Sequence, residues 1–124
     1  MSKPKDKFTL TKPPEATEND VEAGCLRLLA IRGYYPIRLH SGFFRTMDGK
    51  RVLTIGTPGL PDYCVLHTSF PGFLLETKRR LGRYEESQRK LIPILKLGYK
   101  LAVCVARSAA DLSVFLNEHE QRKA

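Results

Sequence analysis

Two short apolar runs separated by a turn constrain the fold of this chain more than any other stretch. Residues 63–66 (Tyr-Cys-Val-Leu) and residues 72–75 (Gly-Phe-Leu-Leu) are short, apolar and partly aromatic or β-branched, as buried strands are. Between them, residues 68–72 (Thr-Ser-Phe-Pro-Gly) carry Pro and Gly in succession, which is a strong turn signal. These features predict a β-hairpin whose two strands belong to the core.

The register of this hairpin determines which polar side chains meet at its open end. If Cys64 pairs with Leu74, the same register places Asp62 opposite Glu76, and facing side chains share one face of the sheet with Cβ atoms about 5 Å apart. Lys78 lies two residues beyond Glu76 and shares that face. Two facing carboxylates repel each other, so we expect a compensating charge. A divalent cation with oxygen ligands would supply it, and Lys78 would supply part of it.

The charge and the cysteine content limit the class of protein. The chain has 124 residues, of which 42% are hydrophobic, and this is enough for one domain with a small core. Its formal charge of +8 favours a polyanionic partner, nucleic acid first and a membrane surface second. The three cysteines are dispersed among apolar residues, as free thiols of a reducing compartment are. Because neither a signal peptide nor a membrane-spanning run is recognisable, we expect a cytoplasmic protein.

The remaining segments predict a single α/β domain at residues 17–124, preceded by a flexible basic arm at residues 1–16. Besides the hairpin, the expected elements are a helix at 18–31 after a capping box, a strand at 34–40, a loop at 41–48, a two-residue turn at 48–49, a strand at 50–55, a helix at 85–97 with a kink at Pro93, a strand at 99–106, and a helix from Ser108 to about residue 117. The order is helix, three or four antiparallel strands, helix, strand, helix. It predicts a central mixed sheet flanked by helices.

Two segments with distinct compositions flank the hairpin. Residues 56–61 (Gly-Thr-Pro-Gly-Leu-Pro) cannot form regular structure and predict a shaped loop that leads to Asp62. Arg79, Arg80 and Arg83 follow Lys78 directly. A run of cations alone is usually a solvated loop, but next to two acids and a lysine it favours a phosphate backbone.

Two carboxylates of the first helix are further candidates. Glu22 lies on the flank of the apolar stripe, where it can face the sheet, and Glu18 lies one turn earlier on the same row. Both also suit the ordinary role of solvated acids at the positive end of the helix dipole. In the following loop, Phe43, Phe44 and Arg45 could stack on bases or grip a backbone, or else form a dimer contact.

The acids and the lysine suggest metal-dependent hydrolysis. Mg²⁺ prefers oxygen ligands, keeps several waters and is typically held by one or two carboxylates together with a substrate phosphate. Asp62, Glu76 and the main-chain carbonyl of Thr77 would hold the metal, and Lys78 would orient or help deprotonate the attacking water. This arrangement would hydrolyse a phosphodiester, and the number of metal ions is left open.

The same residues resemble a known nuclease signature. Pro61-Asp62, then thirteen residues, then Glu76-Thr77-Lys78 is similar to the PD-(D/E)XK motif. The full run Gly-Thr-Pro-Gly-Leu-Pro-Asp at 56–62, the Glu-x-Lys-Arg at 76–79 and Gln88 ten residues after the lysine resemble the VRR-NUC nucleases of that superfamily. The late strand, which is followed by Ala-Arg-Ser at 106–108 and a short helix, also fits. The resemblance runs from about Thr17 to Leu116.

This resemblance implies a restriction-endonuclease-like fold of order α-β-β-β-α-β-α and a Mg²⁺-dependent nuclease in which Mn²⁺ substitutes. It implies that Gln88 points into the site and that a first-helix glutamate completes it. Glu22 is favoured because it lies deeper along the helix, and Glu18 is the alternative. The cations expected to contact DNA are Arg79, Arg80, Arg83, Arg45 and Lys50. The chain is similar to the free-standing, often phage-encoded members and to Holliday-junction resolvases, which implies a homodimer.

The favoured function is therefore a structure-selective DNA endonuclease acting on branched DNA such as Holliday junctions. One alternative is a nuclease acting on flaps or linear DNA, and another is a non-catalytic DNA-binding module of the same fold. A third alternative is a basic α/β protein whose hairpin acids form surface pairs. This alternative predicts no dependence on metal.

Overall fold

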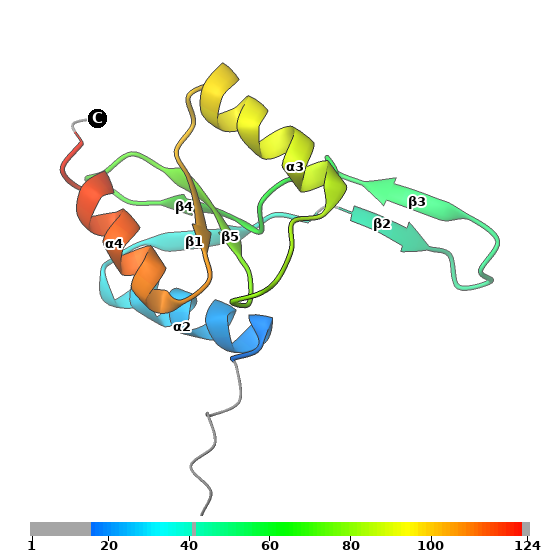
Figure 1. Cartoon of the computed structure of the whole chain (residues 1–124), viewed down its shortest axis with the longest axis horizontal. Coiled ribbons are helices and arrows are strands. Elements are labelled where there is room, and N and C mark those ends of the chain that lie inside the picture. The colour runs from blue at the N-terminus through cyan, green and yellow to red at the C-terminus, as the bar shows by residue number, and fades with distance from the viewer. Residues whose placement is uncertain (1–15, 41, 123–124) are drawn as a thin grey trace, which may run out of the picture.

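The computed structural model describes residues 16–40 and 42–122, so nearly all of the expected arm at residues 1–16 lies outside the described residues. The chain forms an α/β structure (Figure 1). Its elements are, in order, α2 (Glu18–Ile31), β1 (Tyr35–Arg38), β2 (Gly42–Arg45), β3 (Val52–Ile55), β4 (Tyr63–Leu66), β5 (Phe73–Thr77), α3 (Glu86–Pro93), the π-helix η1 (Ile94–Gly98), β6 (Val103–Ala106) and α4 (Ala109–His119).

Four of the strands form the central sheet, in the order β1-β4-β5-β6. The strands β1, β4 and β5 are antiparallel neighbours, whereas β5 and β6 are parallel, so the expected mixed sheet is confirmed. The hairpin register is also confirmed, because Cys64 pairs with Leu74 and the flanking pairs follow the same register. Continuing that register by two residues places Asp62 opposite Glu76.

The segment between β1 and β4 differs from the prediction. Residues 41–48 were expected to be a loop, but Gly42–Arg45 is strand β2, and it pairs with β3 as a separate two-stranded ribbon. Five strands therefore precede α3, not the expected three or four. The two-residue turn at 48–49 is also wrong. The amide of Thr46 donates to the carbonyl of Arg51, so four residues, 47–50, lie within the turn.

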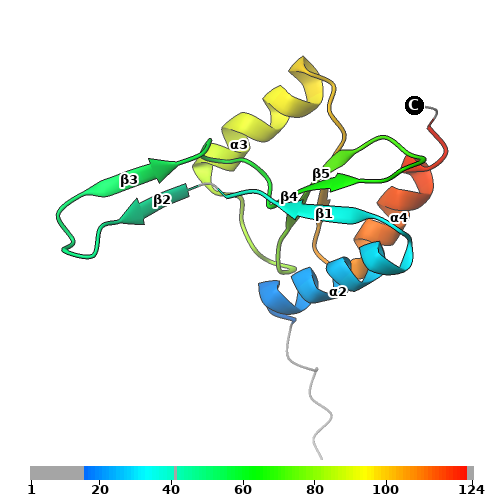
Figure 2. The same ribbon diagram turned by 180° about the vertical axis from the view of Figure 1, so that it is seen from behind.

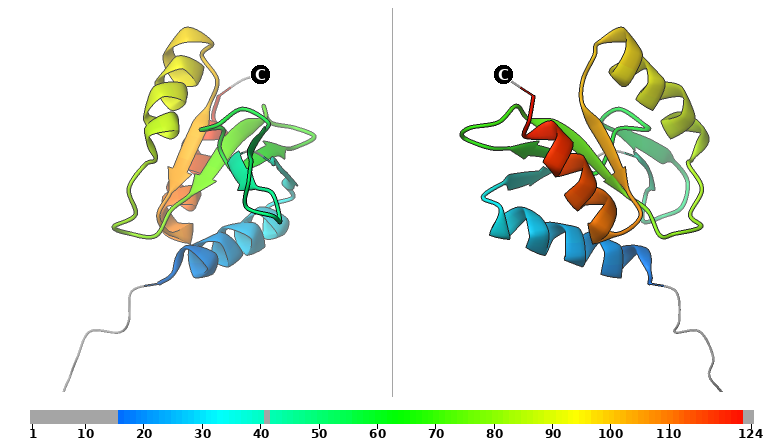
Figure 3. Two further views of the ribbon diagram at one scale, coloured as in Figure 1. Left: turned by 90° about the vertical axis from the view of Figure 1, so that its right-hand side faces the viewer. Right: turned by 60° about the vertical axis from the view of Figure 1, so that its left-hand side comes forward.

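The helices cover both faces of the central sheet (Figure 3). The helices α2 and α4 pack on one face, where the core side chains Cys25, Leu29, Val65, Leu75 and Leu112 are fully buried. Helix α3 lies over the other face, to which the side chains of Leu74 and Glu76 belong by alternation along β5. The acids of the hairpin thus lie between the sheet and α3.

Local signals in the sequence explain the helix bounds. Helix α2 has the expected capping box, in which Asp20 N donates to Thr17 Oγ1 and Thr17 N donates to the Asp20 carboxylate. Ser108 caps α4 by accepting from Asp111 N. At Pro93 the α3 helix gives way to the π-helical turn, because proline has no N–H to continue the α-helical ladder. None of the helices described is long and apolar enough to cross a membrane.

Candidate functional site

A loop and a helix terminus position the polar side chains at the open end of the hairpin. The loop 56–61 ends at Asp62, and Gly59 lies within it with φ +89°. A Cβ on Gly59 would lie 2.3 Å from the carbonyl oxygen of Ser87 and 3.0 Å from the amide nitrogen of Gln88. Only glycine allows this approach, so the loop that carries Asp62 is packed directly on the first turn of α3.

Asp62 is hydrogen-bonded to strand β5, which also carries Glu76. Its Oδ2 accepts from the amide of Thr77 at 3.1 Å and from the Thr77 hydroxyl at 3.0 Å. The register places Pro61 opposite Thr77, and proline has no N–H to donate across the sheet. The carbonyl of Thr77 thus gets no ladder donor from this position.

Glu76 is the most deeply buried acid of this site. Only 3% of its surface is exposed, and its Oε1 is buried without a hydrogen-bond partner among the described residues. Burial is the main cause that raises the pKa of this carboxyl to about 7, and the nearby charge of Asp62 acts in the same direction, against the opposing effects of Lys78 and Gln88. A buried carboxyl with a free oxygen is suited to a cation and poorly suited to a purely structural role.

Lys78 and Gln88 complete the surroundings of Glu76. The Nε2 of Gln88 donates to Glu76 Oε2 at 2.9 Å, and the ammonium of Lys78 lies 3.6 Å from the same oxygen. Gln88 also accepts from the amide of Glu85, which fixes its side chain at the start of α3. The side chains of Glu76 and Lys78 are both buried, so these two residues are not a surface pair.

The two first-helix glutamates have different surroundings. The Oε2 of Glu22 accepts from Arg38 at 2.6 Å and from the Tyr63 hydroxyl at 2.7 Å. Tyr63 pairs with Leu75 and belongs to the core, on the face away from α3. Glu18 is exposed, yet its charge contributes to the raised pKa of Glu76. Arg38 and Tyr63 thus hold the Glu22 carboxylate, whereas the effect of Glu18 is the smallest of those that shift the pKa of Glu76.

Arg107 was noted in the sequence only as part of the segment 106–108 and was given no role. In the structure it organises the cationic segment. Its Nη1 donates to the carbonyls of Arg79, Arg80 and Gly82 at 3.0, 3.2 and 2.6 Å. The side chains of Arg79, Arg80 and Arg83 are exposed on this loop. A guanidinium that serves three carbonyls fixes the loop that carries these cations, immediately after Lys78.

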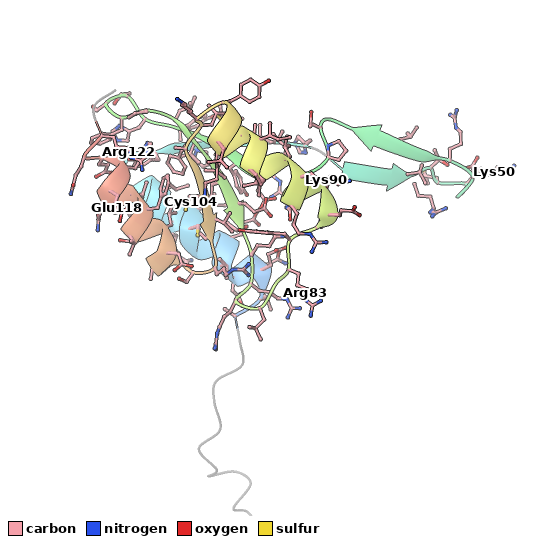
Figure 4. The ribbon with its side chains drawn as sticks, turned by 45° about the horizontal axis from the view of Figure 1, so that its top comes forward. Lys50, Arg83, Lys90, Cys104, Glu118 and Arg122 are labelled. Atoms are coloured by element: carbon pink, nitrogen blue, oxygen red, sulfur yellow. The ribbon has the colours of Figure 1, made fainter. Side chains whose placement is uncertain are left out.

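The other two expected DNA contacts, Arg45 and Lys50, lie elsewhere. Both belong to the β2–β3 ribbon, and the Nη1 of Arg45 donates to the carbonyl of Gly49 near its tip. Figure 4 shows Lys50 at the far end of the ribbon and Arg83 on the loop before α3. The structure thus separates the predicted cations into two groups.

The described residues 16–40 and 42–122 contain no group of three or more His, Cys, Asp or Glu side chains arranged to hold a metal ion. Asp62 and Glu76 provide two carboxylates, and Thr77 provides a backbone carbonyl. A set of this kind can take a cation that keeps much of its water.

Comparisons with protein-family models, with curated proteins and with solved structures found no significant match to this chain. The function proposed below is therefore inferred from the geometry of the site and from the sequence motif.

Proposed function

We propose that this protein is a Mg²⁺-dependent nuclease of the PD-(D/E)XK superfamily, similar to the VRR-NUC group, that hydrolyses phosphodiester bonds in branched DNA. The observation that carries this proposal is the surroundings of Glu76. A buried carboxyl with a pKa of about 7 and an unpartnered oxygen lies beside a second carboxylate and a buried lysine. The mixed sheet with helices on both faces is compatible with the restriction-endonuclease-like fold.

The residues at the site fit a magnesium ion. Asp62, Glu76 and the carbonyl of Thr77 would hold it, and the unpartnered Glu76 Oε1 is the oxygen that most needs a cation. When bound, such an ion lowers the pKa of a coordinated water and neutralises charge that develops on the phosphate. Mn²⁺ has similar ligand preferences and would substitute.

The chain's own residues have distinct roles in this proposal. Lys78 would orient the attacking water and stabilise the negative charge that develops on its oxygen, since its ammonium lies beside Glu76 and is shielded from bulk solvent. Gln88 would keep the Glu76 carboxylate in one orientation through its 2.9 Å hydrogen bond. Arg79, Arg80 and Arg83 would bind the phosphate backbone on both sides of the cut. Arg107 would hold their loop in place.

A cleavage assay tests the proposal. The purified chain is incubated with Mg²⁺, Mn²⁺ or EDTA and with linear, flap, splayed-arm and four-way DNA. We expect metal-dependent cleavage that Glu76→Gln and Lys78→Met each reduce by at least about 100-fold, a typical loss for a group that acts in the transition state. Glu86→Gln is the matched control, because Glu86 lies in an exposed ion pair with Lys90 on α3.

The outcomes separate the alternatives. Cleavage that persists in folded Glu76→Gln and Lys78→Met variants would contradict the site. Equal cleavage of linear and four-way DNA would contradict the preference for branched DNA, and binding without cleavage would favour a non-catalytic module. A homodimer is part of the proposal because two sites can address two strands, and a monomeric mass in sedimentation at micromolar concentration would contradict it.

A further inference from the structure

The β2–β3 ribbon extends away from the rest of the molecule, and Figure 2 shows it from behind. It forms a sheet of its own and shares no strand pairing with the central sheet. An isolated two-stranded ribbon is marginally stable in water, and the exposed Val52 and Leu53 leave apolar surface uncovered on it. This ribbon is therefore suited to being covered by a partner.

Several hydrogen bonds give the tip of the ribbon a defined shape. Asp48 accepts from the Thr46 hydroxyl and from the amide of Lys50, and these bonds hold the pKa of Asp48 below its ordinary value. The amide of Gly49 donates to the carbonyl of Thr46, and Arg45 donates to that of Gly49. Within this braced turn, Met47 is fully exposed and projects no part of its side chain into the protein.

The charges of the ribbon identify the kind of partner. Arg45, Lys50 and Arg51 are exposed and outnumber the single carboxylate of Asp48. A second ribbon carrying the same charge would be repelled, whereas a polyanion would be attracted. The major groove of duplex DNA admits a two-stranded β-ribbon, and methionine is among the apolar side chains that proteins insert between base steps.

The position of the ribbon relates its tip to the site. The strand β3 is followed by the loop 56–61, which is packed on α3 and leads directly to Asp62. Met47 at the tip lies five residue steps along the chain from Gly42 at the base, so the ribbon reaches roughly 17 Å, or about five base pairs. A contact made by the tip would thus lie at a set distance from the bond to be cut.

We propose that the ribbon is a DNA-binding arm that lies in a groove beside the cut site and stacks Met47 on the base pair exposed at a branch point. This inference rests on the nuclease function proposed above and adds a basis for its choice of substrate. Inserting an apolar side chain into intact duplex requires unstacking, and the requirement is smaller where bases are already unpaired. Met47 therefore favours branched over linear DNA.

Binding in EDTA tests this arm without cleavage. Affinities for a four-way junction and for a linear duplex are measured by anisotropy, and 2-aminopurine at the branch reports unstacking. We expect Met47→Ala to lower the junction-to-duplex affinity ratio about five- to tenfold and to remove the fluorescence rise, while Met47→Leu retains both. Lys50→Ala should weaken binding to both substrates equally, and it should reduce the slope of log affinity against log salt concentration by about 1.

Each outcome bears on the arm separately from the nuclease. An unchanged ratio in Met47→Ala, or wild-type binding without a fluorescence rise, would overturn the arm even if the protein cleaves DNA. A rise that depends on Met47 would support the arm even if no metal produces cleavage, which would refute only the nuclease. A change in sedimentation mass in Met47→Ala would also overturn the proposal, because the tip would then contact another copy of the chain.

Discussion

Replacing Glu76 with glutamine should make the metal-free protein more stable at neutral pH while it removes activity. The carboxyl is almost fully buried and its pKa is raised from 4.5 to about 7. In the unfolded chain the group ionises near its ordinary pKa, whereas in the folded chain it resists ionisation. Folding therefore becomes less favourable as the pH rises from about 4.5 to about 7, and glutamine does not carry this pH-dependent penalty.

The magnitude follows from the size of the shift. A rise of roughly 2.5 pKa units corresponds to about 3 kcal/mol, and most of it, about 2 kcal/mol, falls between pH 5 and pH 8. The amide of glutamine leaves a buried polar group without a partner, which costs about 1 kcal/mol at every pH. The variant should therefore match the wild type at pH 5 and exceed its free energy of unfolding by about 2 kcal/mol at pH 8.

Urea unfolding in EDTA at both pH values provides the measurement, followed by a titration with Mg²⁺ at pH 8. Saturating Mg²⁺ should stabilise the wild type, since a ligand that binds only the folded state adds RT ln(1 + [L]/Kd). It should leave Glu76→Gln nearly unchanged. If the free energies of unfolding of the wild type and of Glu76→Gln differ by the same amount at pH 5 and pH 8, folding does not raise the pKa of the Glu76 carboxyl.

Three further perturbations test how the site is held together. Gly59→Ala should lower the free energy of unfolding, measured in urea, by about 3 kcal/mol, because the new Cβ would meet the Ser87 carbonyl. The control Gly49→Ala has a similar φ of +74° but open space around its Cβ, so it should lower the free energy of unfolding by only about 1 kcal/mol. Equal losses in the two variants would contradict the contact between Gly59 and Ser87. Arg107→Lys should speed amide hydrogen exchange at residues 79–82 and weaken DNA binding, and unchanged exchange would show that the loop holds its shape without the guanidinium. Glu18→Gln should lower the pKa of Glu76 slightly, as followed by carboxyl NMR, and an unchanged pKa would contradict the electrostatic effect of Glu18.

The parts of the structure that follow local rules could be predicted from the sequence. Two short apolar runs and a Pro-Gly turn predict the hairpin, and the register assumed from them, which the structure confirms, places Asp62 opposite Glu76. The bounds of α2 follow from the Thr17 capping box in the same way. Each of these signals involves residues that are close together in the sequence.

The features that the sequence did not reveal depend on contacts between distant segments. Arg107 binds carbonyls of residues 79–82, more than twenty positions away, and carbonyl acceptors leave no trace in side-chain patterns. Similarly, Arg38 and Tyr63 converge on Glu22 from two strands, so a glutamate that looked suited to the site is engaged elsewhere. The β2 strand was missed because few of its flanking residues are apolar and its partner β3 belongs to a separate two-stranded sheet.

The surroundings of Glu76 are the main support for the proposed site over a structural pair of acids. A surface pair would leave both acids solvated, but Glu76 is buried beside the charge of Asp62 and keeps one oxygen unpartnered. A buried ion pair between Glu76 and Lys78 alone would stabilise the fold no more than an apolar pair of the same size. The close approach of Gly59 to Ser87 and the Gln88 hydrogen bond hold this unfavourable arrangement in place. Strain of this kind persists where the surroundings impose it, and a cation bound between the acids would relieve it.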